Sequence, residues 1–294
     1  MALPPAHHLI PHLPALHHQI TSDFDFGGDD YRAAHFELQL LPYCLNAATL
    51  ALETLVSEIQ TLVSDYLPSR PPTGTSIRSP KPEYTERLSY QVDHFLDVAR
   101  RAQNSWTRYL RLGLRLQCHG EQLPSSLHDV MKGLLDTRKP RDYGLPEEIR
   151  GELTWYWEEH GKRLKNYRDR AQHMPIIVTS EAQVIVAGDG TSSRRTSSIL
   201  LALPNNPEVT SPARLRFEDP PVHAFSYVRE QYYQLVAFSH WLCDNLIAEP
   251  TDRNKLSFAK APRFSFGPSS LGEAIPTEST LEEITERIKA LGTS

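Results

Sequence analysis

The sequence predicts a mainly α-helical protein, a bundle of long up-and-down helices with a small antiparallel β-hairpin or three-stranded sheet inserted near residues 176–218. Two observations predict this class. Apolar residues recur at alternating spacings of four and three over four long segments, which keeps one face of each helix turned to a core. Between the last two segments, β-branched and apolar residues flank a Gly-Asp-Gly turn, which is typical of a hairpin. The 294 residues are enough to bury a full core.

The long helices are predicted at residues 31–67, 83–117, 146–173 and 222–248. In the first, Pro42 either kinks the helix or begins its main segment. Each helix carries one apolar stripe, so each is expected to pack on the others. The stripes are Leu41, Ala48, Leu52, Leu55, Ile59, Leu62 and Tyr66 in the first helix; Leu88, Val92, Phe95, Ala99, Ala102, Trp106, Tyr109 and Leu116 in the second; Leu153, Trp157, Leu164, Tyr167, Ala171 and Met174 in the third; and Phe225, Val228, Tyr232, Leu235, Leu242 and Leu246 in the fourth.

The inserted sheet is predicted from residues 176–187 and 196–203, with residues 214–217 as a candidate third strand. The turn between the first two strands, Gly188 to Ser193, is no phosphate-binding loop, because it lacks the lysine and the following helix that such a loop needs. Proline content and short apolar patterns predict a linker and two short helices in the rest of the chain, at residues 68–82, 125–135 and 279–291 respectively.

The chain is predicted to consist of three parts. Residues 1–30 are predicted to form a flexible arm rich in histidine and proline, because prolines at positions 4, 5, 11 and 14 oppose a regular helix. Its histidines, at positions 7, 8, 12, 17 and 18, are expected to bind metal only adventitiously. Residues 31–249 are expected to form a single helical domain with the β insertion at 176–218. Residues 250–294 are expected to be an irregular tail with the short helix near its end.

The composition limits the function. The formal net charge of −5 opposes a broad nucleic-acid footprint, although basic residues concentrate on the second and third long helices. No apolar run reaches the roughly 20 residues of a membrane span, and the first residues do not resemble a signal peptide. Cys44, Cys118 and Cys243 lie far apart in apolar contexts, which favours buried free thiols. We therefore expect a cytoplasmic protein that does not bind membranes.

Known metal and cofactor patterns are missing from the sequence. It has no Cys-x-x-Cys pair, no His-Glu-x-x-His and no Glu-x-x-His pair of the kind that di-metal bundles use. We predict no metal and no cofactor.

The candidate functional residues lie near the end of the third long helix, in Tyr167-Arg168-Asp169-Arg170-Ala171-Gln172-His173. Pro175 is expected to end this helix near His173, whose ring would lie at the negative end of the helix dipole. Arg168 and His173 are separated by about 140° around the helix axis at 100° per residue, so one helix alone does not bring them together.

Arg168, followed by the polar Asp169 and then by His173, resembles the Arg-x-x-x-x-His signature of HEPN domains, which are helical bundles that include many metal-independent RNases. The resemblance implies a HEPN-like domain over residues 31–249 and a homodimer in which two copies of each Arg and His face one RNA phosphate. It also implies that Arg168, Asp169 and His173 are catalytic. Members of the family more often carry Asn where this chain has Asp169, which adds negative charge where RNA would approach.

A second hypothesis is a noncatalytic helical interaction module that dimerises and binds a protein partner, such as an antitoxin. The acidic net charge and Asp169 favour this alternative. In this case Arg168 is a helix-end residue that stabilises the fold by about 0.3–1 kcal/mol.

Overall fold

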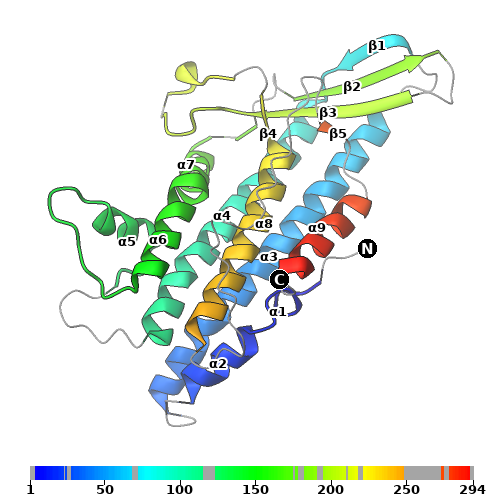
Figure 1. Cartoon of the computed structure of the whole chain (residues 1–294). Helices are drawn as coiled ribbons and strands as arrows, with labels where there is room; N and C mark the ends of the chain where they lie inside the picture. The colour runs from blue at the N-terminus through cyan, green and yellow to red at the C-terminus, as the bar shows by residue number, and fades with distance from the viewer. Residues whose placement is uncertain are drawn as a thin grey trace.

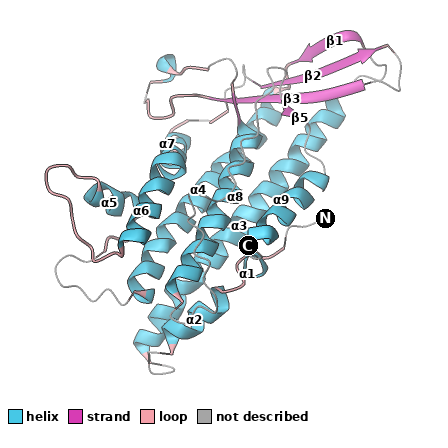
Figure 2. Ribbon diagram, viewed as in Figure 1, coloured by secondary structure: helices cyan, strands magenta, loops and turns pink. Residues whose placement is uncertain are grey.

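The computed structural model describes residues 4–22, 24, 28–67, 72–114, 123–174, 176–177, 182–190, 195–209, 211–217, 221–247, 273–274 and 278–291. Its long helices run side by side, with a small antiparallel sheet across one end of the bundle (Figures 1 and 2). This confirms the predicted mainly α-helical class. The long helices are α3 (Asp29–Tyr66), α4 (Pro82–Gly113), α6 (Glu147–Tyr156) continued by a π-helical turn (Trp157–Gly161) and α7 (Lys162–Ala171), and α8 (Ala224–Leu246).

Where the structure describes them, the predicted apolar stripes lie in one continuous core, with Tyr66 and Ala171 packed at its edge. Met174 is partly buried and is not part of this core, and Leu116 lies outside the described residues. At the centre of the core Trp106 of α4 is fully buried, and its Nε1 donates a hydrogen bond of 2.9 Å to Ser239 Oγ of α8. The same indole meets Tyr156 edge-on, with ring centroids 4.8 Å apart, and lies 4.5 Å from the Phe238 centroid. These contacts join α4, α6 and α8. Pro42 lies inside α3, so the helix does not begin there.

The sheet differs from the prediction in its third strand. β2 (Ala182–Asp189) and β3 (Arg195–Leu203) form the expected hairpin, but the third long strand is β1 (Thr73–Arg78), from the segment predicted to be a linker. β1 pairs antiparallel with β2, with Ile77 opposite Ile185. The predicted strand at 214–217 was wrong, because a 3-10 turn occupies Pro212–Arg214 and no strand follows it up to residue 217. Two short strands, β4 (Val222–His223) and β5 (Glu273–Ala274), also pair with β3.

The N-terminal segment is not the irregular arm that its prolines predicted. It forms α1 (Ala6–Leu9) and α2 (Leu13–Thr21), and Pro14 lies in the first turn of α2, where a missing N–H costs nothing. Apolar side chains between its histidines are buried in the core: Leu9, Ile10, Leu13, Leu16 and Ile20. His17 Nε2 is hydrogen-bonded to the Tyr109 hydroxyl, and Gln19 Nε2 donates to the Leu246 carbonyl at 3.3 Å. The segment is therefore part of the fold.

The two short helices agree with the prediction, whereas the tail predicted to be irregular contains the strand β5 at Glu273–Ala274. Short helices form as expected at α5 (Leu127–Leu134) and α9 (Glu278–Leu291), and Ile284 and Ile288 bury α9 against the core. Of the tail at 250–278, only Glu273–Ala274 and the first residue of α9 lie among the described residues.

Cys44 and Cys243 are buried free thiols, whereas Cys118 lies outside the described residues. α3 is long and apolar enough to cross a membrane by length and composition alone, and half of its most apolar window is buried inside the fold.

Candidate functional site

The candidate residues lie where α7 ends against α4. α7 stops at Ala171, and Gln172 and His173 form the turn that follows, with the His173 N–H bonded to the Arg170 carbonyl at 2.9 Å. This agrees with the expected helix end. Tyr167, fully buried one residue before Arg168, donates its hydroxyl hydrogen to the Pro204 carbonyl at 2.5 Å. That bond attaches α7 to the segment that leaves β3, and so fixes the helix that carries the motif.

The π-helical turn before α7 sets the orientation of the motif. It depends on Gly161, because a Cβ at this position would lie 2.9 Å from the Trp157 ring. Trp157 is buried, and the Arg100 guanidinium lies 5.6 Å from its ring centroid. The widened turn therefore lets α6 and α7 pack on α4 as one nearly continuous helix.

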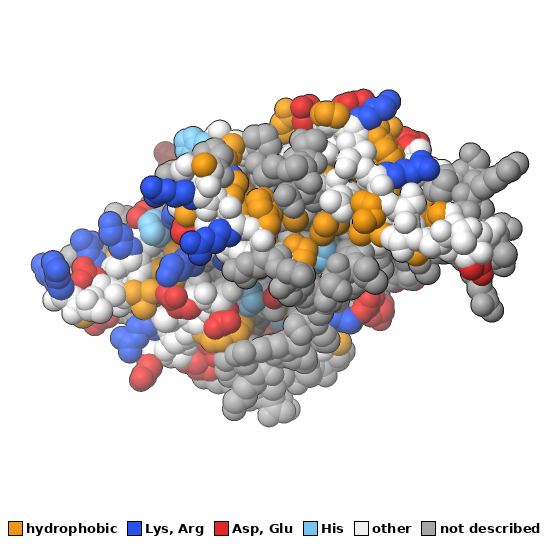
Figure 3. All heavy atoms as spheres, turned by 90° about the horizontal axis from the view of Figure 1, so that it is seen from above, with side chains coloured by type: hydrophobic (Ala, Val, Ile, Leu, Met, Phe, Trp, Pro, Cys, Tyr) orange, Lys and Arg blue, Asp and Glu red, His pale blue; other side chains and the backbone are white. Residues whose placement is uncertain are grey.

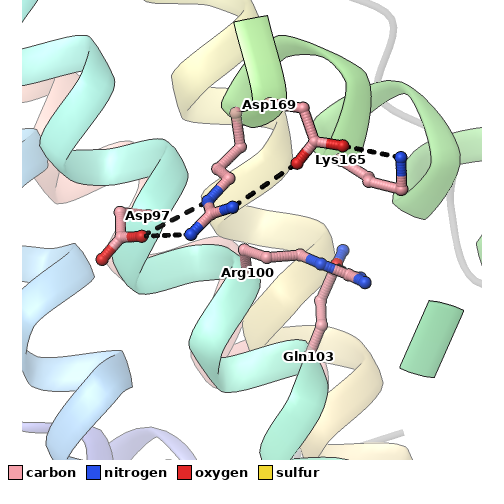
Figure 4. A network of polar contacts seen from close by, with 6 residues as sticks. Asp97, Arg100, Gln103, Lys165 and Asp169 are labelled. Carbon is pink, nitrogen blue, oxygen red and sulfur yellow. Dashed lines mark hydrogen bonds and ion pairs between the residues drawn. The ribbon is translucent and has the colours of Figure 1, made fainter. Parts of the chain in front are cut away.

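Arg168 is held between two carboxylates. Its Nε and Nη2 donate to Asp97 Oδ1 of α4 at 3.4 and 3.3 Å, and its Nη1 donates to Asp169 Oδ1 at 3.5 Å. Its side chain is 29% exposed, so the guanidinium is accessible from solvent. Figure 4 shows Asp97 and Asp169 on opposite sides of this guanidinium. These are long contacts, which leave room for a stronger anion to replace a carboxylate.

Asp169 also binds a lysine. Lys165 Nζ donates to Asp169 Oδ2 at 2.6 Å, one helical turn back along α7 (Figure 4). Partial burial alone would raise the pKa of Asp169, but the hydrogen bonds and charges of Lys165 and Arg168 outweigh it and hold that pKa below its ordinary value. Asp169 is therefore ionised at neutral pH and neutralises part of the positive charge around it.

Arg100 forms the buried side of the network. Its Nη1 donates to Gln103 Oε1 at 3.0 Å, and Gln103 Nε2 donates to the Tyr156 hydroxyl at 2.9 Å. Burial lowers the pKa of Arg100, and the nearby Asp169 opposes this effect. Asp129 also acts on Arg100, so the cations Arg100, Lys165 and Arg168 are matched by the carboxylates Asp97, Asp129 and Asp169. The site thus has no excess of positive charge.

His173 does not join this network. It is exposed, and among the described residues its imidazole makes no hydrogen bond. The structure therefore brings Arg168 and Asp169 together but leaves His173 apart from Arg168 within one chain, as the angle between them around the helix predicted.

The motif region presents fewer charges to solvent than the sequence suggested. Arg170 is buried, with Nη1 on the Val209 carbonyl at 3.3 Å, and Arg163 donates to the Tyr167 hydroxyl at 3.3 Å. In Figure 3, Lys and Arg gather on the side of the molecule where α5, α6 and α7 lie, with Asp and Glu between them. This surface is mixed in charge.

Sequence reasoning missed Asp93, Asp97 and His128. Asp93 and Asp97 lie one turn apart on α4, and their polar spacing beside the apolar stripe was the available signal. His128 of α5 lies 5.6 Å from Trp157 between ring centroids, and burial, followed by the charge of Lys165, lowers its pKa. Its position next to the network depends on the packing of α5 on α4, which no local pattern predicts.

Across the described residues, no group of three or more His, Cys, Asp or Glu side chains is arranged to hold a metal ion. Comparisons with protein-family models, with curated proteins and with solved structures give no match for this chain. The geometry around Arg168 and the resemblance of its motif are therefore the features that point to a function.

Proposed function

We propose that the protein is a metal-independent endoribonuclease of the HEPN type that acts as a homodimer. One observation carries the proposal: the Arg168 guanidinium is fixed at an accessible position by Asp97 and Asp169, and His173 is exposed on the turn that ends the same helix. A positioned guanidinium binds phosphate through two parallel N–H groups, and an imidazole is the most common general acid and base in enzymes.

The reaction is a transesterification. One His173 takes the proton from a ribose 2′-hydroxyl as its oxygen attacks the adjacent phosphorus, and Arg168 stabilises the charge on the phosphorane. The bond from phosphorus to the 5′-oxygen breaks, and that oxygen takes a proton from the His173 of the second copy. The products are a 2′,3′-cyclic phosphate and a 5′-hydroxyl. Positioned acid–base catalysis of this kind contributes roughly 10²–10⁴ in rate.

The second copy supplies what one chain lacks. Because Arg168 and His173 are separated around α7, a two-fold axis is needed to place two arginines and two histidines on one phosphate. Asp97 and Asp169 then act as positioning residues, since they hold the guanidinium and yield to the phosphate oxygens when RNA binds.

The test is cleavage of a fluorescent single-stranded RNA by the purified full chain in EDTA, with the cyclic phosphate end identified by mass spectrometry. Arg168→Ala and His173→Ala should each abolish cleavage. Matched controls are Arg150→Ala on the exposed side of α6 and His18→Ala in α2, both exposed, which should leave the rate unchanged. Absence of cleavage by the wild-type protein on every RNA tested would overturn the proposal.

A noncatalytic interaction module is the second candidate. It is favoured by the two carboxylates on Arg168, which offset the charge that would attract RNA. This function predicts a folded protein without RNase activity, in which Arg168→Ala lowers the melting temperature instead of a rate.

A further inference from the structure

α3 has a second apolar stripe, on the side away from the core. Phe36, Tyr43 and Leu50 are 76%, 61% and 62% exposed, and they are spaced seven residues apart. Leu40 and Ala47, both partly buried, lie between them and complete an alternating spacing of four and three. This is the spacing with which one helix packs along another in a coiled coil. At 1.5 Å per residue, the stripe from Phe36 to Leu50 is about 21 Å long.

The stripe is also free of charge. No Asp, Glu, Lys or Arg occurs in α3 between Glu37 and Glu53. A helix face that contacts water normally carries charged or polar residues, and large exposed apolar patches mark interaction surfaces. The outward side of α3 therefore has the character of an interface.

The centre of the stripe lies close to the Arg168 site. The Arg101 guanidinium of α4 lies 5.8 Å from the Tyr43 ring centroid. Asp97, which binds Arg168, precedes Arg101 by about one helical turn on α4, or roughly 6 Å along the axis. Tyr90, 67% exposed, is seven residues before Asp97 and lies on the same face of α4. One surface therefore includes Tyr43, Tyr90 and the Arg168 site.

We propose that a second copy of this chain covers the stripe, with the two α3 helices antiparallel about a two-fold axis near Tyr43. Phe36 of each copy then packs beside Leu50 of the other. The two-fold axis lies in the plane between the two α3 helices and is perpendicular to them. Such an axis leaves α4 and α7 on the same side of the α3–α3 interface in both copies. The two Arg168 sites then face each other near the axis. The use of this pairing in catalysis rests on the proposed function, but the pairing itself does not.

The exposed stripe supplies the apolar centre of a dimer interface, and the polar residues around it supply the rest of the area. Aromatic side chains bury about 150–250 Å² each, so Phe36 and Tyr43 offer about 250 Å² per copy and about 500 Å² for the pair. Leu50, Tyr90 and the residues beside them add to this apolar centre. Stable interfaces bury about 1,200–2,000 Å² in total with a polar rim, and Asp97, Arg101 and His94 supply such a rim on α4.

The first test is sedimentation equilibrium of the full chain at micromolar concentration. The wild type should be a dimer, and the double variant Phe36→Glu and Leu50→Glu should raise its dissociation constant at least 100-fold. The substituted side chains are exposed in one chain, so circular dichroism should remain unchanged. Ile77→Glu, at a residue 60% exposed on β1, is the matched control and should leave the dimer intact.

The second test fixes the orientation through engineered disulfides. Tyr43→Cys alone should cross-link the two copies on oxidation, and Phe36→Cys mixed with Leu50→Cys should cross-link as well. Phe36→Cys alone should not exceed the wild-type background. Parallel helices would give the reverse result for the Phe36→Cys variant, which would overturn the antiparallel pairing.

The outcomes separate the two proposals. If the wild-type dimer dissociates in the double variant but the wild type cleaves no RNA, the proposed pairing is supported and the proposed nuclease activity is overturned. A wild-type monomer at tens of micromolar overturns the pairing, even if it cleaves RNA. A monomer that floats with phosphatidylcholine vesicles only when Phe36 and Leu50 are present would assign the stripe to a membrane and overturn the pairing. A dimer that persists in the double variant would place the interface elsewhere and overturn it as well.

Discussion

Arg168 and Asp97 are joined across α7 and α4, with two guanidinium nitrogens on a single carboxylate oxygen at 3.3 and 3.4 Å. Both side chains are partly exposed, 29% for Arg168 and 47% for Asp97. Exposed pairs of this kind contribute about 0–1 kcal/mol to stability. The contact therefore holds the guanidinium in position more than it holds the fold together, and the effects of substitutions at the two residues should separate these roles.

Arg168→Ala should abolish RNA cleavage while it lowers the melting temperature by only a few degrees, because the lost ion pairs are partly exposed. Arg168→Lys should not restore the activity, since an ammonium group lacks the two parallel donors of a guanidinium. The Arg168→Ala and His173→Ala double variant should be no slower than either single variant. The two residues act on one phosphate as a unit, so removing either one already removes most of the catalysed rate. An unfolded Arg168→Ala protein would assign the arginine a structural role.

Asp97→Asn should tighten the binding of single-stranded RNA several-fold. The substitution keeps the shape of the side chain but removes a negative charge that competes with phosphate for Arg168. Fluorescence anisotropy at two salt concentrations measures the effect, which should weaken as salt screens the charges. Glu86→Gln, at an exposed position about three turns earlier on α4, is the control for a general change in charge. Equal tightening in both variants would show that Asp97 has no specific competition with phosphate.

The sequence predicted the long helices well, because their apolar spacing is regular and each stripe is buried in the structure. It failed at β1, where Thr73, Gly74 and Ser76 lack the apolar character of a strand and prolines flank the segment. This edge strand is exposed along most of its length and is stabilised by its pairing with β2. Because β2 lies more than 100 residues further along the chain, no local pattern predicts the pairing. The prediction of an irregular N-terminal arm was wrong for a similar reason, since tertiary burial of Leu13 and Leu16 outweighs the local effect of proline.

For the candidate site, the sequence placed Arg168, Asp169 and His173 on one helix end and predicted that Arg168 and His173 diverge around it. It could not predict that Asp97 and Arg100 lie next to them, because helix neighbours are set by the packing of α4 on α7. Local patterns thus located the motif, whereas its electrostatic surroundings required the fold.

Trp106→Ala should destabilise the protein by about 3–5 kcal/mol, the usual cost of removing a large buried aromatic side chain. Trp106 is fully buried between Tyr156 and Phe238 and donates a hydrogen bond to Ser239. Ser239→Ala should cost less, about 1–3 kcal/mol, because it leaves the buried indole N–H without its acceptor but keeps the ring packing in place. Urea unfolding measures both values, and similar costs for the two variants would contradict the central role of the indole.

Acid should loosen the N-terminal helices through His17. Burial, with a smaller effect of His35, lowers the pKa of His17 from its ordinary value of 6.5 to about 4. Between these values the unfolded chain binds a proton that the folded chain does not, so the free energy of unfolding falls as pH decreases from about 6.5 to about 4. His17→Gln should flatten this dependence, whereas His18→Gln at the exposed neighbour should not. Chemical denaturation at pH 7 and pH 5 makes the comparison.

Asp93 should give the opposite dependence on pH. It lies on α4 between Ser89, whose Oγ accepts the Ile176 N–H at 3.1 Å, and Asp97, which binds Arg168. Residues four apart share one helix face, so Asp93 lies on α4 between the contact of Ser89 with Ile176 and the contact of Asp97 with Arg168. Its Oδ1 is buried without a hydrogen-bond partner among the described residues, and burial raises its pKa from 3.8 to about 7.

Between about pH 4 and pH 7 the folded chain keeps a proton on Asp93 that the unfolded chain has released, so this residue makes the fold less stable as pH rises through that range. Asp93→Asn should therefore match the wild type near pH 3.5 and become progressively more stable than it as the pH rises to 8, with Glu86→Gln as the exposed control. Urea unfolding at the two pH values decides, and equal stability of Asp93→Asn and wild type at pH 8 would contradict the buried, ionisable carboxyl group.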